Sequence, residues 1–186
     1  MTILDWSVIA FLLAAASERL YARRYSRWAT RGRVKMRWTL VTLDLTHALI
    51  YCGSALEYFL LRRKVFWPVS LLGLSAYAVS VFVRHAAIRT LGKFWSLHLE
   101  MRENHQLVRE GIYQYVRHPA YSAIMMEVIA IPLVAGAYYT LFLSMGAYLP
   151  VLLVRWAGEE REMVGKFGEQ YRQYQQEVPA FFPWLR

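Results

Sequence analysis

Five apolar segments divide the chain, of which the first four are separated by polar stretches and the last two meet at an uncharged turn. The second and third are long enough to cross a bilayer, and the shorter first segment has aromatic ends suited to the membrane interface. Lipid cannot satisfy open backbone groups, so each crossing is expected to be helical. The pattern predicts an all-α integral membrane protein with about five transmembrane helices, the last two forming a hairpin that turns near Gly136. The segments are residues 6–21, 38–61, 65–87, 122–138 and 140–156.

A polar stretch after Trp156 repeats apolar side chains at helical spacing. This spacing predicts an amphipathic tail helix, and two prolines beyond it are expected to end the helix. We expect the apolar stripe to pack against the domain or lie on the membrane, since such stripes usually mean burial. The stripe is Met163, Phe167, Tyr171 and Tyr174, and the prolines are Pro179 and Pro183.

Composition is consistent with one compact membrane-embedded domain over residues 1–186, with 57% hydrophobic and 16% aromatic residues. Within it, residues 1–90 are expected to hold three helices. Residues 91–186 are expected to hold a polar connector, the helical hairpin and the C-terminal segment. The single cysteine, Cys52, lies in an apolar run and is expected to be a packing residue.

Charge is distributed unevenly along the chain. The net charge is +9, and eight of the 22 Lys and Arg residues fall between Arg19 and Arg37, directly after the first apolar segment. This placement indicates contact with anionic membrane lipids and argues against a nucleic acid partner. The positive-inside rule then predicts an external N-terminus and a cytoplasmic C-terminus. The cluster from Arg62 to Lys64 opposes the rule.

Hydrogen-bonding residues crowd just before the fourth segment, in the stretch HQLVREGIYQYVRHPAY from His105 to Tyr121. Pro119 suits the first turn of a helix and disfavours helical geometry at His118. His118 is therefore expected to lie outside the helix, available to a ligand. The alternative is a simple helix start in which Arg117 reaches phosphate headgroups.

A second candidate group, in the sequence RWAGEE, follows the fifth segment. Arg155 and Glu159 are four residues apart on one helix face, so they either pair with each other or bind a ligand. In the second case, Glu159 would bind hydroxyls or an ammonium group and Arg155 would bind an anion. Glu160 is open to either role or to none.

Three carboxylates lie within apolar segments, where an unpaired charge is costly. We expect Asp44, Glu57 and Glu127 to be paired structurally, Asp44 with His47 one turn away. Glu127 lies about two turns beyond His118 and is also a candidate for the same cavity. The histidines have no accompanying cysteines or carboxylates at metal-ligand spacing, so no metal site is predicted.

The linked blocks HQLVREGIYQYVRHPAY, RWAGEE and FGEQYRQYQQEVPAFFP resemble the isoprenylcysteine carboxyl methyltransferase family over residues 91–183. The resemblance implies a methyltransferase that uses S-adenosyl-L-methionine, with Arg155 meeting the substrate carboxylate. It implies that ten residues line the cofactor site: His105, Gln106, Leu107, Val108, Tyr113, His118, Pro119, Ala120, Tyr121 and Glu159.

The residue types suit this chemistry. A carboxylate is ionised at neutral pH and needs no strong base to attack a methyl sulfonium, and the planar guanidinium of Arg155 matches a carboxylate. The expected substrate is a lipophilic or prenylated molecule, such as a prenylated cysteine. Two alternatives remain at this point. One is a methyltransferase acting on phospholipids or on other small lipophilic amines or thiols, and the other is a non-enzymatic membrane scaffold or transporter.

Overall fold

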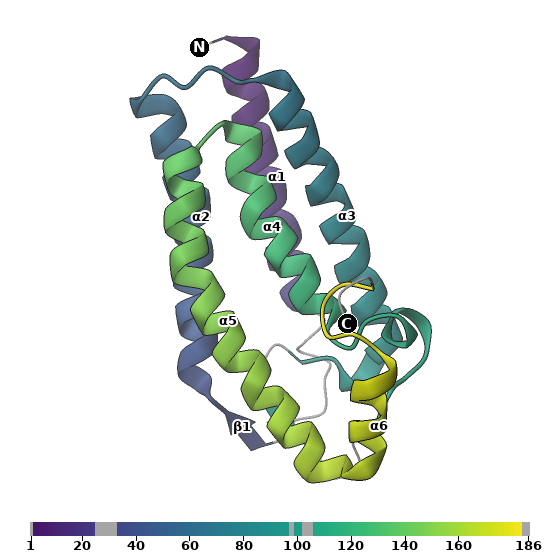
Figure 1. Cartoon of the computed structure of the whole chain (residues 1–186). Helices are drawn as coiled ribbons and strands as arrows, with labels where there is room; N and C mark the ends of the chain where they lie inside the picture. The colour runs from purple at the N-terminus through teal and green to yellow at the C-terminus, as the bar shows by residue number, and fades with distance from the viewer. Residues whose placement is uncertain (1, 25–32, 97–98, 102–105, 184–186) are drawn as a thin grey trace.

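A computed structural model describes residues 2–24, 33–96, 99–101 and 106–183. Within these residues, five long helices form an elongated bundle in which they lie side by side, and a short sixth helix lies at the end where the C-terminus is (Figure 1). The long helices are α1 (Ile3–Arg24), α2 (Arg37–Leu60), α3 (Trp67–Leu91), α4 (Pro119–Ala135) and α5 (Tyr138–Phe167), and the short one is α6 (Glu169–Glu177).

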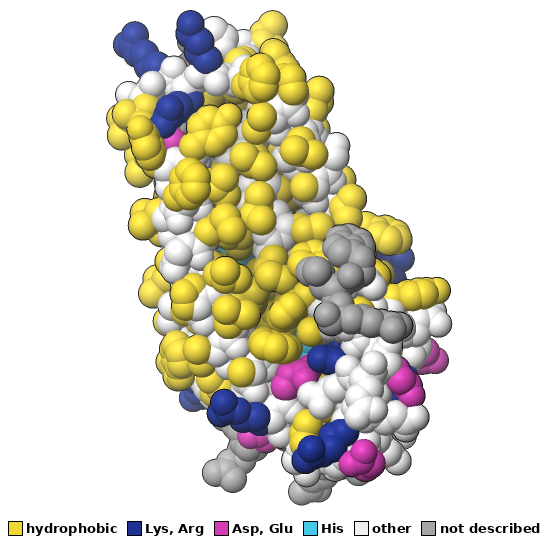
Figure 2. Space-filling model, viewed as in Figure 1, with side chains coloured by type: hydrophobic (Ala, Val, Ile, Leu, Met, Phe, Trp, Pro, Cys, Tyr) yellow, Lys and Arg dark blue, Asp and Glu magenta, His cyan; other side chains and the backbone are white. Residues whose placement is uncertain are grey.

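Three of the described helices are long and apolar enough to cross a membrane, namely α2, the span Trp67–Phe94 that contains α3, and α5. The apolar helix α4 is shorter, at 17 residues. Large apolar side chains are exposed on the bundle, among them Phe82 and Phe142, and charged side chains gather at its two ends (Figure 2). A belt of exposed apolar side chains between charged ends is what a bilayer requires. The protein is an integral membrane protein, and five crossings remain a prediction.

The tail helix begins elsewhere than the sequence indicated. Helix α5 continues without interruption through Trp156 to Phe167, so the first half of the predicted tail belongs to α5. Gly168, with φ 55°, makes the turn into α6, because its positive φ is costly for other residues. The separate tail helix is therefore only α6. Its apolar stripe packs as expected, with Tyr171 and Tyr174 in a cluster with Val178.

Two strands of three residues were not predicted. Strand β1 (Arg33–Lys35) pairs antiparallel with β2 (Leu99–Met101) and joins the segment after α1 to the connector after α3. The connector also contains the 3-10 helices η2 (Gly92–Phe94) and η3 (Gly111–Gln114). Three residues are too few to show a strand pattern in a sequence.

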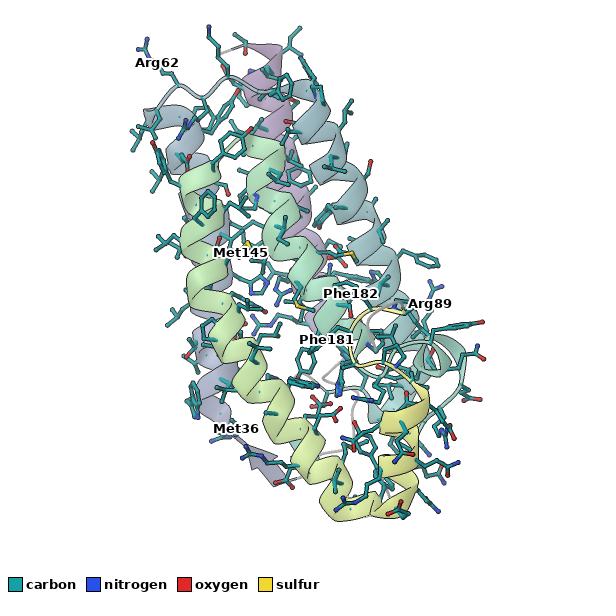
Figure 3. The ribbon with its side chains drawn as sticks, viewed as in Figure 1. Met36, Arg62, Arg89, Met145, Phe181 and Phe182 are labelled. Atoms are coloured by element: carbon teal, nitrogen blue, oxygen red, sulfur yellow. The ribbon has the colours of Figure 1, made fainter. Side chains whose placement is uncertain are left out.

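The hairpin between α4 and α5 turns at Gly136 as predicted, with φ 65°. The start of α5 is held by Glu57 of α2, whose carboxylate accepts hydrogen bonds from the backbone N–H groups of Tyr139 (3.1 Å) and Thr140 (2.7 Å). Arg63 pairs with the same carboxylate at 3.0 Å. One cation of the basic cluster that opposes the positive-inside rule thus neutralises a helix-capping acid. Its neighbour Arg62 lies at the end of the bundle opposite the C-terminus (Figure 3).

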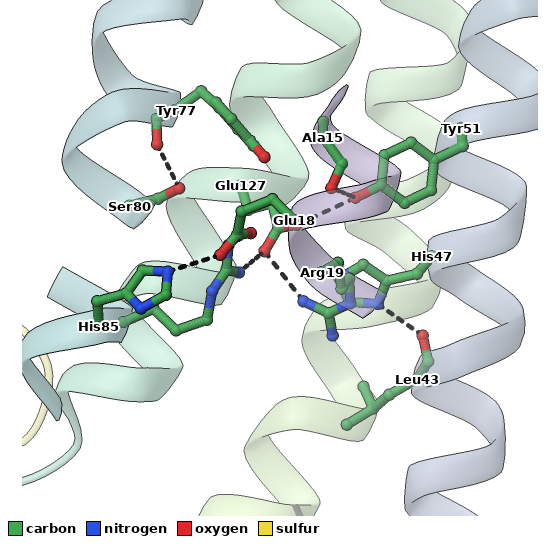
Figure 4. A network of polar contacts seen from close by, with 11 residues as sticks. Ala15, Glu18, Arg19, Leu43, His47, Tyr51, Tyr77, Ser80, His85 and Glu127 are labelled. Atoms are coloured by element: carbon green, nitrogen blue, oxygen red, sulfur yellow. Dashed lines mark hydrogen bonds and ion pairs between the residues drawn. The ribbon is translucent and has the colours of Figure 1, made fainter. Parts of the chain in front are cut away.

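Four charged side chains inside the bundle form what we call the interior ion network: Glu18, Arg19, Arg84 and Glu127. Figure 4 labels Glu18, Arg19 and Glu127 of this network. Glu127 is fully buried and pairs with Arg19 at 3.0 Å and with Arg84. Arg84 also pairs with Glu18. The network joins α1, α3 and α4, and the expected structural pairing of Glu127 is confirmed.

The expected pair between Asp44 and His47 is wrong. Asp44 pairs with Arg23 of α1 at 2.5 Å. The Nδ1 of His47 faces the carbonyl oxygen of Leu43 at 2.8 Å, and its ring lies edge-on to Tyr148. A cation on a neighbouring helix is a stronger partner for a carboxylate than a neutral ring one turn away.

Candidate active site

A cavity of about 180 Å³ lies at the end of the bundle that holds α6 and the connector. On the same measure of volume a single water molecule needs roughly 10–15 Å³, so the cavity has room for a ligand. Its walls come from α1 to α6 and from the connector. Nine of the residues predicted for the site line it: Gln106, Leu107, Val108, Tyr113, His118, Ala120, Tyr121, Arg155 and Glu159.

Two predicted residues stand apart. Pro119 is buried at the start of α4 and is not among the lining residues. His105 lies outside the described residues. The cofactor roles implied for all ten residues stay predictions.

The start of α4 has the predicted geometry. Pro119 occupies its first turn, and His118 before it is non-helical, with φ −126° and ψ 58°. The backbone N–H of His118 donates to the carbonyl oxygen of Ala180 at 2.9 Å, and that of Arg117 donates to Pro179 at 3.0 Å. Phe181 and Phe182 consequently lie beside this end of α4 (Figure 3). The C-terminal segment thus holds His118 at the cavity wall.

Glu160, whose role the sequence left open, is surrounded by protein groups. One oxygen lies 2.5 Å from Nε2 of His118 and accepts a hydrogen bond from the hydroxyl of Tyr171 at 2.9 Å. Arg117 pairs with it at 3.4 Å, and the amide of Gln175 donates to its other oxygen. Glu160 is not among the lining residues of the cavity. Its contacts join α4, α5 and α6, which is a structural role.

Glu159, by contrast, lies at the cavity wall. The hydroxyl of Tyr121 donates to the carboxylate of Glu159 at 2.6 Å and accepts a hydrogen bond from Nε of Arg155 at 3.1 Å. We call these three residues the site chain. The sequence suggested a direct pair between Arg155 and Glu159 or separate ligand roles. The structure adds a phenol that links the guanidinium to the carboxylate.

A threonine from α2 fixes the second arm of the guanidinium. Arg155 donates from Nη1 to the hydroxyl of Thr39 at 3.1 Å, and that hydroxyl donates to the carbonyl oxygen of Met36 at 2.7 Å. Thr39 is fully buried and Arg155 is 6% exposed. Held at two nitrogens, the guanidinium has a fixed plane at the cavity, which favours recognition of a planar anion.

The connector closes the other side of the cavity. Tyr113 is buried, and its carbonyl oxygen accepts a hydrogen bond from the hydroxyl of Tyr174 at 2.5 Å. Burial raises the pKa of Tyr113 well above its ordinary value, and burial raises the pKa of Tyr174 to about 12. Both phenols are therefore neutral at physiological pH and able to donate hydrogen bonds.

Several other polar residues of the wall were not predicted as site residues. Arg19, Arg23, Asp44 and Arg84 line the cavity from α1, α2 and α3, and Tyr148 lines it from α5. The sequence signal that could have found them is the presence of ionisable groups inside or beside apolar segments, which marks function or pairing by default. The first three helices therefore contribute side chains to the wall of the cavity.

The fold and the cavity together define a helical membrane protein with a candidate active site at one end of the bundle. The family model of the isoprenylcysteine carboxyl methyltransferases matches residues 71–165, more than half of the chain. The chain belongs to this family and is a methyltransferase, which excludes the alternative of a scaffold or transporter.

Several characterised and uncharacterised proteins are similar to the chain. Protein-S-isoprenylcysteine O-methyltransferase B of Arabidopsis thaliana is 29% identical, over 84% of this chain and 83% of its own. The uncharacterised protein YpbQ of Bacillus subtilis is 27% identical, over 85% and 95%. A solved structure of the eukaryotic intramembrane Ras methyltransferase ICMT matches the fold with a TM-score of 0.71 at 18% identity, covering 99% of this chain and 69% of that one.

Proposed function

We propose that this protein transfers a methyl group from S-adenosylmethionine to the carboxylate of a lipophilic acceptor such as a prenylated cysteine. The observation that carries the proposal is the site chain, which sets a cation and an anion at one cavity. Arg155 and Glu159 face it from one side of α5, linked by the hydroxyl of Tyr121. The related methyltransferases named for prenylated cysteine support this choice of acceptor.

The residues present fit the cofactor. S-Adenosylmethionine supplies a methyl group on a sulfonium, activated for in-line displacement. Glu159, a carboxylate at the cavity wall, suits its ribose hydroxyls or its ammonium group. The aromatic rings of Tyr113 and Tyr121, both at the wall, suit the sulfonium cation. Gln106 and His118 add polar groups on the connector side.

Arg155 is assigned to the acceptor. Its guanidinium is buried and held at two nitrogens, and such a group binds a carboxylate with a fixed orientation. A carboxylate is ionised at neutral pH, so the protein needs to position it and not to deprotonate it. Positioning of reactants alone contributes up to roughly 7–11 kcal/mol in ideal cases.

The cavity also suits an acceptor that comes from the membrane. Apolar side chains line part of its wall, among them Leu40, Leu43 and Ile124. These residues lie on α2 and α4, which belong to the apolar bundle. In this proposal the whole chain forms one methyltransferase domain, with the site and the C-terminus on the cytoplasmic side, where the positive-inside rule places them.

The test is methyl transfer by purified protein in lipid vesicles, with tritiated S-adenosylmethionine and three acceptors. These are an N-acetyl-S-prenylcysteine, its carboxamide analogue and a phosphatidylethanolamine. We expect label in the first acceptor only, and mild alkali should release it as methanol because the product is a methyl ester. Alkali-stable label in the phospholipid would show that the acceptor group is an amine and not a carboxylate. No transfer to any acceptor would contradict the proposal.

A further inference from the structure

Tyr148 of α5 is a buried tyrosine at the cavity that the proposed mechanism does not use. It is 2% exposed and lines the cavity. No group among the described residues forms a hydrogen bond with its hydroxyl. Buried polar groups in proteins are nearly always paired, so an unpaired one at a cavity requires an explanation.

The position of Tyr148 on its helix places it in line with the site chain. Tyr148, Arg155 and Glu159 are spaced by seven and four residues, which puts all three on one face of α5. All three line the same cavity. Tyr148 lies two turns from Arg155, toward the apolar middle of the helix.

Charged side chains of the cavity wall lie within electrostatic range of Tyr148. The charged groups that act on it electrostatically are Arg19, Glu127, Arg155 and Asp44, and all but Glu127 line the cavity. Two of these neighbours are guanidinium groups. These cations attract an oxygen that carries negative charge, and a phenol near them can donate a hydrogen bond to that oxygen.

A neighbouring ring holds Tyr148 in place. His47 of α2 packs edge-on against it, with ring centroids 5.0 Å apart and an interplanar angle of 82°. The Nδ1 of His47 is itself tied to the carbonyl of Leu43 at 2.8 Å. This edge-to-face contact stabilises the position of the tyrosine ring.

From this arrangement we infer that the Tyr148 hydroxyl donates a hydrogen bond to an oxygen of the methyl acceptor and thereby sets which acceptors bind. The inference rests on the proposed function and deepens it. The oxygen belongs either to the acceptor carboxylate or to the acyl group beside it. In both cases Tyr148 acts on the acceptor and leaves the cofactor site untouched.

The experiment compares Tyr148→Phe with the wild-type protein, using an N-acetyl-S-prenylcysteine and an S-prenyl-3-mercaptopropionate that lacks the acyl group. Phenylalanine keeps the ring against His47 and removes only the hydroxyl. We expect acceptor KM to rise about tenfold, the usual effect of losing one hydrogen bond to a charged or polar group. The kcat and the affinity for S-adenosylmethionine should stay within about twofold. If KM rises for both acceptors, the hydrogen bond from Tyr148 goes to the carboxylate. If KM rises only for the acetylated acceptor, the hydrogen bond goes to the acyl oxygen.

Tyr77→Phe is the matched control. Tyr77 of α3 also has a buried hydroxyl without a partner among the described residues, but it packs on Phe11 and is not among the residues that line the cavity. Its substitution should leave acceptor KM unchanged. An unchanged KM in Tyr148→Phe, or an equal rise in both variants, would overturn the inference.

Direct binding separates this inference from the proposed function. Calorimetric titration of the acceptor into the protein requires no turnover. Binding that weakens about tenfold in Tyr148→Phe supports the inference even if the wild-type protein transfers no methyl group, an outcome that would reject the proposed function alone. Absence of acceptor binding by the wild-type protein would overturn both.

Discussion

The interior ion network and the site chain both place charged side chains inside the bundle, and they differ in what faces the cavity. In the network, the two acids Glu18 and Glu127 lie behind the wall, held by Arg84 and, for Glu127, also by Arg19. In the site chain, the acid Glu159 lies at the wall itself, and its hydrogen bond comes from a neutral phenol.

This difference separates structural charges from functional ones. A buried carboxylate next to cations is neutralised within the protein and has little to offer a ligand. A carboxylate beside a phenol keeps its negative charge available to a cation or a hydroxyl in the cavity. Substitutions in the network are therefore expected to lower stability. Substitutions in the site chain are expected to lower ligand binding or turnover.

The largest effect is expected from Glu127→Gln. The substitution leaves Arg19 and Arg84 without the carboxylate that they share. Breaking a buried ion pair by removing one partner costs about 3–5 kcal/mol. Unfolding followed by denaturant in detergent micelles should show this loss of stability.

Glu169→Gln is the matched control for this stability measurement. Its carboxylate lies on α6, with a side chain 86% exposed and 4.0 Å from Arg172. The control should change the free energy of unfolding by no more than about 0.5 kcal/mol. A Glu127→Gln protein as stable as the control would show that the network does not stabilise the bundle.

Arg155→Ala should abolish most methyl transfer while the protein remains folded. The acceptor carboxylate loses its partner in a buried site, which costs about 2–5 kcal/mol. Lysine at this position should restore activity only in part, because a point charge cannot reproduce the planar guanidinium. Rates of label transfer measure the effect.

Arg161→Ala serves as the control for Arg155. This arginine is exposed on the same helix, α5, and is not among the lining residues of the cavity. Its loss should leave the transfer rate unchanged. Near-normal turnover by Arg155→Ala would show that the guanidinium does not bind the acceptor.

Tyr121→Phe should have a smaller effect on two properties at once. The phenol links Arg155 to Glu159, so its loss releases both side chains from their fixed positions. Each hydrogen bond to a charged group contributes about 1.5–3 kcal/mol. We expect cofactor affinity and acceptor turnover each to fall roughly tenfold or more.

Tyr115→Phe is the control for Tyr121. Tyr115 is 61% exposed, and its substitution should change neither property. A fall in only one property in Tyr121→Phe would show that the hydroxyl does not link the two sites.

Much of the fold was predictable because its causes are local. Long apolar runs gave the helices, and Gly136 and Pro119 marked a turn and a helix start that the structure confirms. The sequence places the end of the fifth segment at Trp156, because polarity changes there, but the backbone stays helical to Phe167. Hydropathy indicates which residues can lie in lipid, whereas a helix can continue into polar sequence.

The composition of the site was predictable only where its residues are close in sequence. Gln106 to Tyr121 form a continuous block, and Arg155 and Glu159 share a helix turn. The partners from other helices were not predictable, because Thr39 lies 116 residues from Arg155 and Arg19 lies 108 from Glu127. Such pairs are decided by helix packing, which a hydrophobic pattern does not specify.

Titration of S-adenosylmethionine into the wild-type protein, Glu159→Ala and Arg155→Ala tests the central claim most directly. The site chain divides its two charges between cofactor and acceptor. Glu159→Ala should therefore show no measurable binding, whereas Arg155→Ala should keep its affinity within about threefold, or roughly 0.7 kcal/mol. Equal weakening in both variants would contradict the division and identify Arg155 and Glu159 as a structural pair. Retained affinity in Glu159→Ala would show that this carboxylate does not bind the cofactor.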